Sequence, residues 1–376
     1  MKDKVSAVIF EGGDTAGETE EMMVRVRHAV LLDNIGKMKN VDQLSSLYLL
    51  TNYSQLAEAA DSLGVNIVND AGVLENGFHF GRVLRQLINM EDLQHIFYMG
   101  GASIPLIGVD ELAGMCSQLL NSSPIIFANN VQSADIIAFT PASLINYIYP
   151  PGQDNILAVT LRDSTGVNMK LLPHSLGFLF DLDTPADLLI LASSPWTGEQ
   201  ARRAINQLEL DLSSINKAKE VLSGDYEEVL LLGRVGGPLI SYINKNLKVR
   251  LRIFSEERGM KALGREESGE VVSLMGFFLE RVGVYEFIRY LEKVSKCAFI
   301  DTRVLMAHLN LKPTAEERFL SDLGRWEEIR TPFLRDLTRA VKESHIPIIL
   351  GGHSLVLGGL WSLVDEIGPT HPYGNM

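Results

Sequence analysis

Short apolar runs alternate with helix-like patterns along the first half of the chain. Runs rich in Val, Ile, Leu and Phe predict strands, and stretches with an apolar residue every three or four positions predict helices. The predicted strands are 5–10, 46–51, 65–69, 95–100, 124–129, 135–140, 155–161 and 177–183, and the predicted helices are 22–32, 53–63, 80–88, 109–120 and 141–147. Strands and helices that alternate at this spacing predict an α/β fold with a mostly parallel sheet covered on both faces.

The stretch SSPWTGE (193–199) marks a predicted boundary. We expect two domains, 1–193 and 194–376, the second also α/β but richer in helix. The second domain is predicted to contain a strand–glycine turn–helix unit at 229–239, with further strands at 249–254, 297–305 and 346–353 and helices at 199–222, 271–294 and 331–344. The polar segment RFLSDLGRWEEI (318–329) is expected to be either a lid or a solvated connection.

Charge narrows the range of ligands. The 376 residues carry a net charge of −13. Residues 1–193 hold 10 Lys and Arg against 22 Asp and Glu, whereas residues 194–376 hold 24 against 25. Neither half predicts a basic surface for nucleic acid. The acidic first half is expected to repel a free nucleotide unless a divalent cation screens it.

Several common site types are not indicated by the sequence. The two cysteines, Cys116 and Cys297, lie far apart in apolar stretches, which fits a reducing cytoplasm. The first residues lack the apolar length of a signal peptide, and we expect no membrane span. G-x-S-x-G, H-E-x-x-H and G-x-G-x-x-G patterns are absent from the sequence.

Two glycine-containing loops follow predicted strands in the first half. One contains Gly12, Gly13, Asp14 and Thr15, and the other contains Gly100, Gly101 and Ser103. Ligands of parallel sheets bind beyond the carboxyl ends of the strands, so both loops are candidates for binding phosphate through backbone N–H groups. Alternatively, both are plain turns, with Thr15 or Thr19 capping a helix whose first turn holds the acidic run 18–21.

Three segments carry a resemblance to a known family. They are AVIFEGGDT (7–15), YMGGASIPLIGVDEL (98–112) and GFLFDLDTPADLLIL (177–191), with a weaker fourth, HAVLLDNIGKM (28–38). Through them, residues 4–193 resemble the MobA-like nucleotidyltransferases, which include molybdenum-cofactor and phospholactate guanylyltransferases. The resemblance implies a glycosyltransferase-A-type, Rossmann-like fold. It also implies transfer of a nucleotidyl group from an NTP, with Mg²⁺, to a small phosphorylated acceptor.

The resemblance also implies roles for individual residues. The loops at Gly12–Thr15 and Gly100–Ser103 would hold the nucleotide, and Asp183 would hold the metal. The family has a Lys after its glycine loop, a place taken here by Arg27 or His28. Ser103 stands where the family has an Asp that binds Mg²⁺, and a hydroxyl lacks the charge that this cation prefers. Asp183 is alternatively a helix-start residue before Thr184-Pro185, and Asp187 a local cap.

The second half has candidate residues of its own at three predicted strand ends. They are Arg234 with Gly236 and Gly237, then Asp301 with Arg303, and finally Gly351, Gly352 and His353. Arginine suits the bidentate binding of phosphate or carboxylate, so the three strand ends predict one anion site. Alternatively, Asp301 and Arg303 form an ion pair and His353 is a buried structural group.

Three functional hypotheses follow. In the first, the protein is a nucleotidyltransferase in which Arg27, His28 or Arg234 supplies the missing positive charge. In the second, the fold is a non-catalytic sensor or scaffold that binds a nucleotide or another anion. In the third, an enzyme site lies in the second half around Asp301, Arg303 and His353.

Overall fold

The computed structural model describes residues 4–68, 78–131, 133–261 and 263–368. By its contacts the chain divides into two units, the first formed by Met1–Asp14 and Arg27–Phe178, and the second by Thr15–Val26 and Leu179–Met376. The predicted boundary after residue 193 lies between helices α7 (Pro185–Ser193) and α8 (Glu199–Ile205). The motif DLDTP (181–185) therefore belongs to the second unit.

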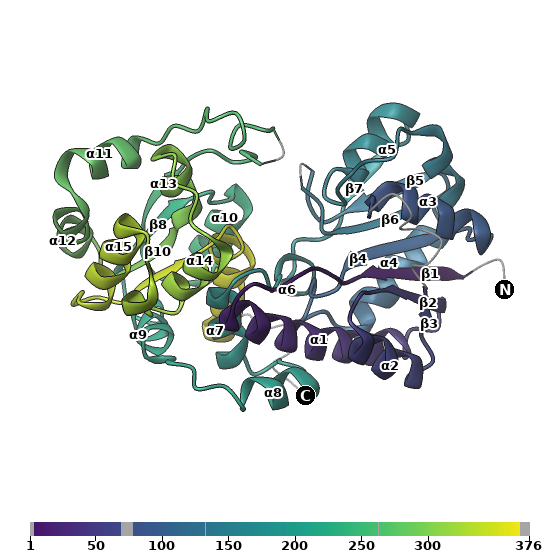
Figure 1. The fold of residues 1–376 in the computed structure, drawn as a ribbon, viewed down its shortest axis with the longest axis horizontal. Coiled ribbons are helices and arrows are strands. Elements are labelled where there is room, and N and C mark those ends of the chain that lie inside the picture. Colours follow the sequence, from purple (N-terminus) through teal and green to yellow (C-terminus); the bar gives the residue numbers. More distant parts are fainter. Residues whose placement is uncertain (1–3, 69–77, 132, 262, 369–376) are drawn as a thin grey trace. The chain divides into compact units, whose positions relative to one another are not determined.

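The first unit contains a seven-stranded sheet in the order β3-β2-β1-β4-β6-β5-β7 (Figure 1). The strands are β1 (Val5–Phe10), β2 (Leu44–Leu50), β3 (Asn66–Ile67), β4 (Ile96–Gly100), β5 (Ile125–Ala128), β6 (Ile136–Thr140) and β7 (Met169–Leu171). All neighbours pair in parallel except β6, which is antiparallel to both β4 and β5. The predicted mostly parallel α/β sheet is thus confirmed.

The chain order reverses between β1 and β4. From β1 it continues to β2 and β3 on one side, and β4 is then added on the other side of β1. Phe10 pairs with Leu50 of β2 and with Gly100 of β4, so three strands end at the same level. Such a switch point opens a crevice between the loops that follow the two strands, and the predicted glycine loops flank it.

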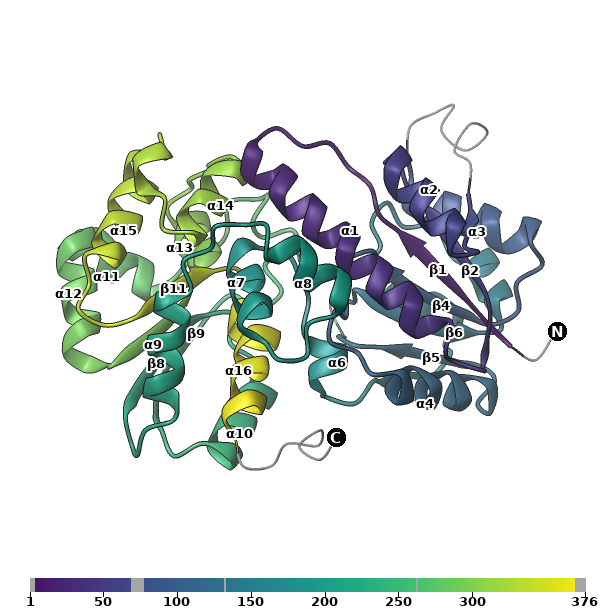
Figure 2. The same ribbon diagram turned by 90° about the horizontal axis from the view of Figure 1, so that it is seen from below.

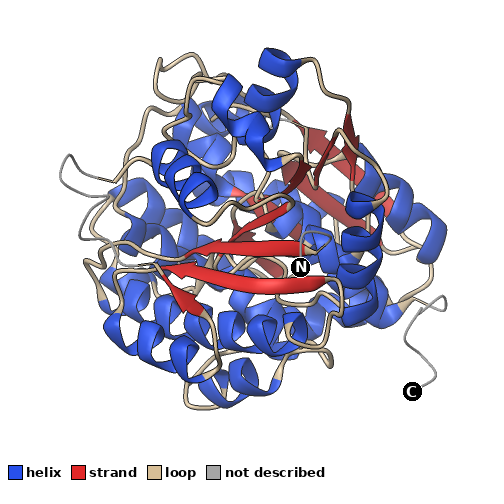
Figure 3. Ribbon diagram, turned by 90° about the vertical axis from the view of Figure 1, so that its right-hand side faces the viewer, coloured by secondary structure: helices blue, strands red, loops and turns tan. Residues whose placement is uncertain are grey.

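Helices cover both faces of this sheet, as Figure 3 shows. One face packs against α1 (Glu18–Met38), α2 (Ser54–Ser62) and α4 (Val109–Leu120), and the other against α3 (Phe80–Met90), the 3₁₀ turn η2 (Ala142–Tyr147) and α5 (Leu157–Thr165). Figure 2 shows α1 as one long helix of 21 residues; its first turns belong to the second unit and its remainder to the first.

Two predicted strands of the first half are wrong. Residues 155–161 form the start of α5, because Leu157, Ala158 and Leu161 recur at helical spacing and are all buried. Residues 177–183 begin in the short helix α6 (Leu176–Leu179), where Gly177 lies against Glu111. Of the predicted strand 65–69, residues 66 and 67 form β3, and residue 69 lies outside the described residues.

The second unit contains a four-stranded sheet, entirely parallel, in the order β11-β10-β8-β9. The strands are β8 (Glu228–Gly233), β9 (Arg250–Ser255), β10 (Cys297–Asp301) and β11 (Ile348–Gly351). This sheet also has a switch point, because β9 is added on one side of β8 and β10 on the other. The ends of β8 and β10 are therefore the predicted ligand-binding position of this unit.

The helices of the second unit are more broken than the sequence pattern predicts. One sheet face packs against α11 (Leu274–Val282), α12 (Val284–Val294), α13 (Thr302–His308) and α15 (Pro332–Lys342). Gly283, with φ of 79°, separates α11 from α12. The predicted helix 199–222 is divided into α8 and α9 (Ser213–Leu222), and the predicted strand 297–305 ends at Asp301, where α13 begins. The chain continues through α10 (Gly237–Asn246), the π-helical turn η4 (Leu355–Gly359) and α16 (Leu360–Ile367).

Segment 318–329 is neither a lid nor a solvated connection. Its first part is the end of helix α14 (Ala315–Asp322), followed by the 3₁₀ turn η3 (Trp326–Glu328). Leu320, Ser321 and Asp322 are buried, which no exposed loop would allow. Across the part of the chain that is described, no helix combines the length and apolarity needed to cross a membrane.

Candidate functional site

The switch point of the first sheet is filled by a carboxylate. Glu11 follows β1 and is buried, and Arg27 of α1 donates to both of its oxygens, at 3.1 and 2.8 Å. Gly101 lies against Glu11, because a Cβ on Gly101 would be 2.2 Å from Oε2. Glu11 therefore takes up space beside β4, and the charge of Arg27 is balanced within the protein.

The backbone of the first glycine loop is bound internally. The N–H of Gly13 donates to Oδ1 of Asn52 at 3.1 Å, and Nδ2 of Asn52 donates to the carbonyl of Gly13 at 3.0 Å. Gly12 is close to the same side chain, and Gly12, Gly13, Asp14 and Thr15 are all exposed. A phosphate could bind the Gly13 N–H only by replacing Asn52.

His28 is half-buried next to this loop. Its ring lies edge-on to Tyr53, with 4.6 Å between ring centroids, and its Nε2 has no partner among the described residues. Burial lowers the pKa of His28, and the charge of Arg27 adds to this effect while Glu11 opposes it. The side chain is therefore a neutral imidazole at pH 7 and does not replace the family's Lys charge.

Two side chains of α1 hold the loop after β4 through hydrogen bonds to its backbone carbonyl groups. Asn34 donates to the carbonyl of the buried Ser103 at 3.0 Å, and Nζ of Lys37 donates to the carbonyl of Pro105 at 2.8 Å. The hydroxyl of Ser103 lies near Gly100, where an added Cβ would be 3.2 Å away. Asn34 and Lys37 are not among the residues predicted from the sequence, although both lie in the segment 28–38 that carries the weaker resemblance.

The N-terminus of α1 is capped by a carboxylate from a distant part of the second unit. Glu316 of α14 accepts from the backbone N–H of Thr19 and of Glu20, both at 3.1 Å. Gly17 makes room for it, because a Cβ there would be 2.4 Å from the carboxylate. The buried Oγ1 of Thr19 has no partner in the described part of the chain. Thr19 is thus not the predicted cap, whereas the acidic run does occupy the first turn of α1.

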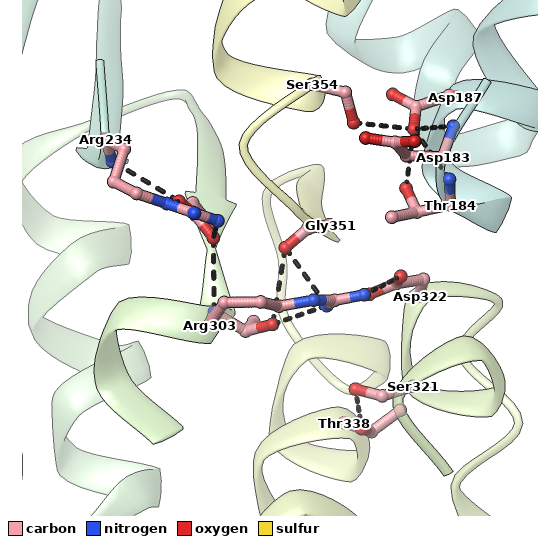
Figure 4. A network of polar contacts seen from close by, with 12 residues as sticks. Asp183, Thr184, Asp187, Arg234, Arg303, Ser321, Asp322, Thr338, Gly351 and Ser354 are labelled. Atoms are coloured by element: carbon pink, nitrogen blue, oxygen red, sulfur yellow. Dashed lines mark hydrogen bonds and ion pairs between the residues drawn. The ribbon is translucent and has the colours of Figure 1, made fainter. Parts of the chain in front are cut away.

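The segment DLDTPAD (181–187) contains an exposed aspartate, Asp183, and a buried one, Asp187. Oδ2 of Asp187 accepts hydrogen bonds from the backbone N–H groups of Asp183 and Thr184 and from the Thr184 hydroxyl. It also accepts one from the hydroxyl of Ser354, at 2.6 Å (Figure 4). Burial raises the pKa of Asp187 to about 7, the nearby Asp183 adds to this, and the hydrogen bonds oppose it. Asp187 is both the predicted cap of α7 and an anchor for the loop after β11.

At the switch point of the second sheet, Arg234 and Asp301 form a buried pair. Nε of Arg234 lies 2.6 Å from Oδ2 of Asp301, and Nη2 lies 3.1 Å from Oδ1 (Figure 4). Gly233, the last residue of β8, has φ of 113°, and a Cβ there would be 2.4 Å from Cβ of Asp301. Burial opposes ionisation of Asp301, yet Arg234 keeps its pKa below the usual range.

Arg303 pairs with Asp322 and not with Asp301. The two side chains form a bidentate pair at 2.8 and 2.7 Å, and Nη1 of Arg303 also donates to the carbonyl of Gly351 at 3.1 Å (Figure 4). Asp301 meets Arg303 only at its backbone N–H, at 3.2 Å. The interpretation of Asp301 and Arg303 as one ion pair is therefore wrong, and Arg303 is a structural link between β10, α14 and β11.

His353 follows Gly351 and Gly352 and is half-buried close to this pair. Burial and the charge of Arg234 lower the pKa of His353 to about 4, Arg258 lowers it further, and Asp301 and Asp183 oppose these effects. Nη2 of Arg258 is 3.9 Å from the position of a Cβ on Gly236, which is the N-cap of α10. The structure thus gathers the predicted strand-end residues and adds Arg258, which the sequence did not single out.

The residues do not form a recognisable metal site. No group of three or more His, Cys, Asp or Glu side chains among the described residues is placed to hold a metal ion. Asp183 lies in the second unit, whereas Ser103 and the loop residues Gly12, Gly13 and Asp14 lie in the first. The donor set expected for Mg²⁺ from the resemblance is therefore not assembled within either unit.

No family model and no curated protein sequence matches this chain. Solved structures that it resembles include a cytidylyltransferase from Leptospira borgpetersenii serovar Hardjo-bovis, with 17% identity, a TM-score of 0.40, and coverage of 54% of this chain and 93% of the other. Another is 4-diphosphocytidyl-2C-methyl-D-erythritol synthase, with 13% identity, a TM-score of 0.37, and coverage of 50% and 97%. A third is CMP:2-keto-3-deoxy-manno-octonic acid synthetase complexed with CTP, with 10% identity, a TM-score of 0.32, and coverage of 45% and 88%.

Proposed function

We propose that the second unit binds the phosphate or carboxylate group of a small molecule beside the switch point of its sheet. The observation that carries this proposal is the placement of Arg258. Its guanidinium is exposed next to the Gly236 N-cap of α10, and it forms no hydrogen bond or ion pair with any residue of the described ranges. We define the anion site as Gly236, Gly237, Arg258 and His353.

The surroundings favour an anion there. Helix α10 begins without a side-chain cap. Pro238 has no N–H, so the N–H groups of Gly237 and Leu239 and the positive dipole end are available to a ligand. Asp301 cannot balance Arg258, because Arg234 already holds both of its oxygens. The exposed Asp183 lies within electrostatic reach of His353 and opposes an anion, so Asp183→Asn is expected to tighten binding.

Calorimetric titration of the full-length protein with inorganic phosphate, pyrophosphate and NTPs tests the proposal. Arg258→Ala is expected to weaken binding about tenfold, which is the effect of losing one charge-assisted hydrogen bond. Arg252→Ala is the matched control, since Arg252 is an exposed arginine on the neighbouring strand β9. Equal weakening by both substitutions, or no binding by any of the anions, would contradict the proposal.

Nucleotidyl transfer in the first unit is a second candidate. The observation that favours it is the position of the loops Gly12–Thr15 and Gly100–Ser103 on either side of the β1–β4 switch point. The resemblance to MobA-like nucleotidyltransferases supports the same activity, with an NTP, Mg²⁺ and a phosphorylated acceptor as its reactants. The buried Glu11 and the Asn52–Gly13 hydrogen bonds oppose it, because both must be rearranged before a triphosphate can bind.

Hydrogen exchange separates the two candidates. Addition of an NTP with Mg²⁺ is expected to protect amides of residues 11–16 and 100–106 if the nucleotide binds in the first unit. Protection of residues 234–240 alone assigns binding to the anion site of the second unit. Arg258→Ala is expected to remove the second pattern and leave the first unchanged.

A further inference from the structure

A separate cavity lies along the outer edge of β11 in the second unit. Its volume is about 230 Å³, which is room for roughly eight water molecules. Its walls come from α9, from the end of α14, from α15 and from the strand itself. We call this cavity the β11 pocket, and it includes none of the residues of the anion site.

Several polar side chains that line the pocket already have hydrogen-bond or ion-pair partners within the protein. Asp322 is held by Arg303, and Ser321 shares a hydrogen bond of 2.6 Å with Thr338. Lys342 forms an ion pair of 2.9 Å with Asp211. These side chains therefore line the pocket without adding a net charge to it.

Lys217 of α9 gives the pocket its unbalanced positive charge. It lines the cavity and forms no hydrogen bond or ion pair with any residue that the structure describes. Asp211 also accepts from the Ser213 N–H at 3.0 Å, and these hydrogen bonds, with that from Lys342, hold its pKa well below the usual value. Asp211 is consequently ionised and balanced, and the ammonium of Lys217 is the charge left for a ligand.

The other donors also suit an anion with hydroxyl groups. Ser214 in the first turn of α9 lines the pocket, and this helix of 10 residues has no side-chain cap at Leu212. The carboxylate of Asp211 accepts from the Ser213 N–H at this end of the helix, so the unbalanced positive charge on this wall is that of Lys217. His345 lies on the opposite wall, where Glu292 faces it and accepts from its backbone N–H at 2.8 Å.

We propose that the β11 pocket binds a small hydroxylated anion, a sugar- or polyol-type phosphate or carboxylate, through Lys217 and Ser214 of α9. The site is independent of the proposed anion site around Arg258. The phosphate and the carboxylate share the same recognition chemistry, and the experiment distinguishes them.

The test is hydrogen exchange of the full-length protein with glycerol 3-phosphate, glycerate and, as a neutral control, glycerol. Either anion is expected to protect residues 211–217 and 342–348, and glycerol to protect neither. Lys217→Ala is expected to weaken the protection about tenfold in ligand concentration. Ser214→Trp, which fills the pocket from the same helix, is expected to abolish it.

Lys245→Ala is the matched control, because Lys245 is an exposed lysine in the last turn of α10, away from the pocket. Protection by glycerol, absence of protection with both anions, or equal effects of Lys217→Ala and Lys245→Ala would overturn the proposal. Arg258→Ala is expected to leave this protection intact. Its loss in that variant would assign the ligand to the other site and overturn the β11 pocket.

Discussion

The guanidinium of Arg234 holds both oxygens of Asp301 at the point where the chain order of the second sheet reverses, with distances of 2.6 and 3.1 Å. The first sheet has an equivalent pair, Arg27 with Glu11, at its own switch point. In both sheets the usual ligand-binding position thus contains an arginine whose charge is already balanced. A ligand must bind beside these pairs or replace one member of them.

Asp301→Asn is expected to destabilise the second unit by about 3–5 kcal/mol, because it leaves a buried guanidinium without a counter-charge. Urea denaturation followed by circular dichroism measures the change. Glu228→Gln is the control, since Glu228 pairs with the exposed Arg250 and is expected to cost less than about 1 kcal/mol. Similar losses in both variants would show that the Arg234–Asp301 pair is not buried as described.

Gly233→Ala is expected to lower the free energy of unfolding by about 2–4 kcal/mol. The residue has φ of 113°, and the added methyl would lie 2.4 Å from Cβ of Asp301, so strain and a steric clash act together. Gly237→Ala, four residues later, has no atom within 4 Å of the new methyl and is expected to change stability by less than about 1 kcal/mol. Thermal unfolding of both variants tests the difference.

The stability of the second unit is expected to depend on the ionisation of Asp187. Its pKa is about 7 in the folded protein and about 3.9 in an unfolded chain. Because the folded pKa is the higher one, the stabilisation from protonated Asp187 is complete below pH 4 and is lost as the pH rises to 7. Asp187→Asn cannot ionise, so its stability relative to wild type should rise by about 4 kcal/mol between pH 4 and pH 8.

Chemical denaturation at a series of pH values measures this change. Asp183→Asn is the matched control, because removal of the neighbouring charge should move the wild-type transition to lower pH without abolishing it. A constant stability difference between wild type and Asp187→Asn across this range would contradict the assignment.

Binding of phosphate at the anion site is expected to be accompanied by proton uptake. His353 has a pKa of about 4 because burial of its half-buried side chain and the nearby Arg234 and Arg258 lower it, whereas Asp301 and Asp183 act in the opposite direction. A bound anion favours the imidazolium and raises this pKa, so affinity should increase as the pH falls from 7 towards 5. Calorimetry at pH 5 in buffers of different ionisation enthalpy measures the protons, and His353→Gln should remove the uptake.

Glu316→Ala is expected to destabilise the attachment of the first turns of α1 by about 1–2 kcal/mol, because two backbone N–H groups lose their acceptor. Hydrogen exchange of residues 17–24 reports this change directly. Glu327→Ala is the control, since Glu327 is exposed in η3. Unchanged exchange in the Glu316 variant would contradict the capping role.

The hydrophobic pattern predicted the sheets well because burial on both faces leaves continuous apolar runs, as in β1, β4 and β8. It failed at residues 155–161, where a short apolar run fits a helix as well as a strand. Ion-pair partners were not predictable, because sequence order does not specify which charges meet. Asp301 lies two residues from Arg303 but pairs with Arg234, 67 residues away.

The candidate site shows the same limit. The glycine loops were placed correctly at the ends of β1 and β4, because strand-then-glycine is a local signal. That Asn52 occupies the Gly13 N–H depends on β2 lying beside β1, a tertiary relationship. Arg258 has no local motif, and only the position of Gly236 beside it reveals the anion site.

Because residues 15–26 belong to the second unit, this unit cannot finish folding until the C-terminal half of the chain has been synthesised. Thr19 and Glu316 are 297 residues apart, so this segment leaves the ribosome long before its partner is made. The second unit can acquire its full set of contacts only near the end of synthesis, whereas most of the first can fold earlier. A fragment that starts at Leu179 lacks a piece of its own fold, and the two units cannot be separated by a single cut.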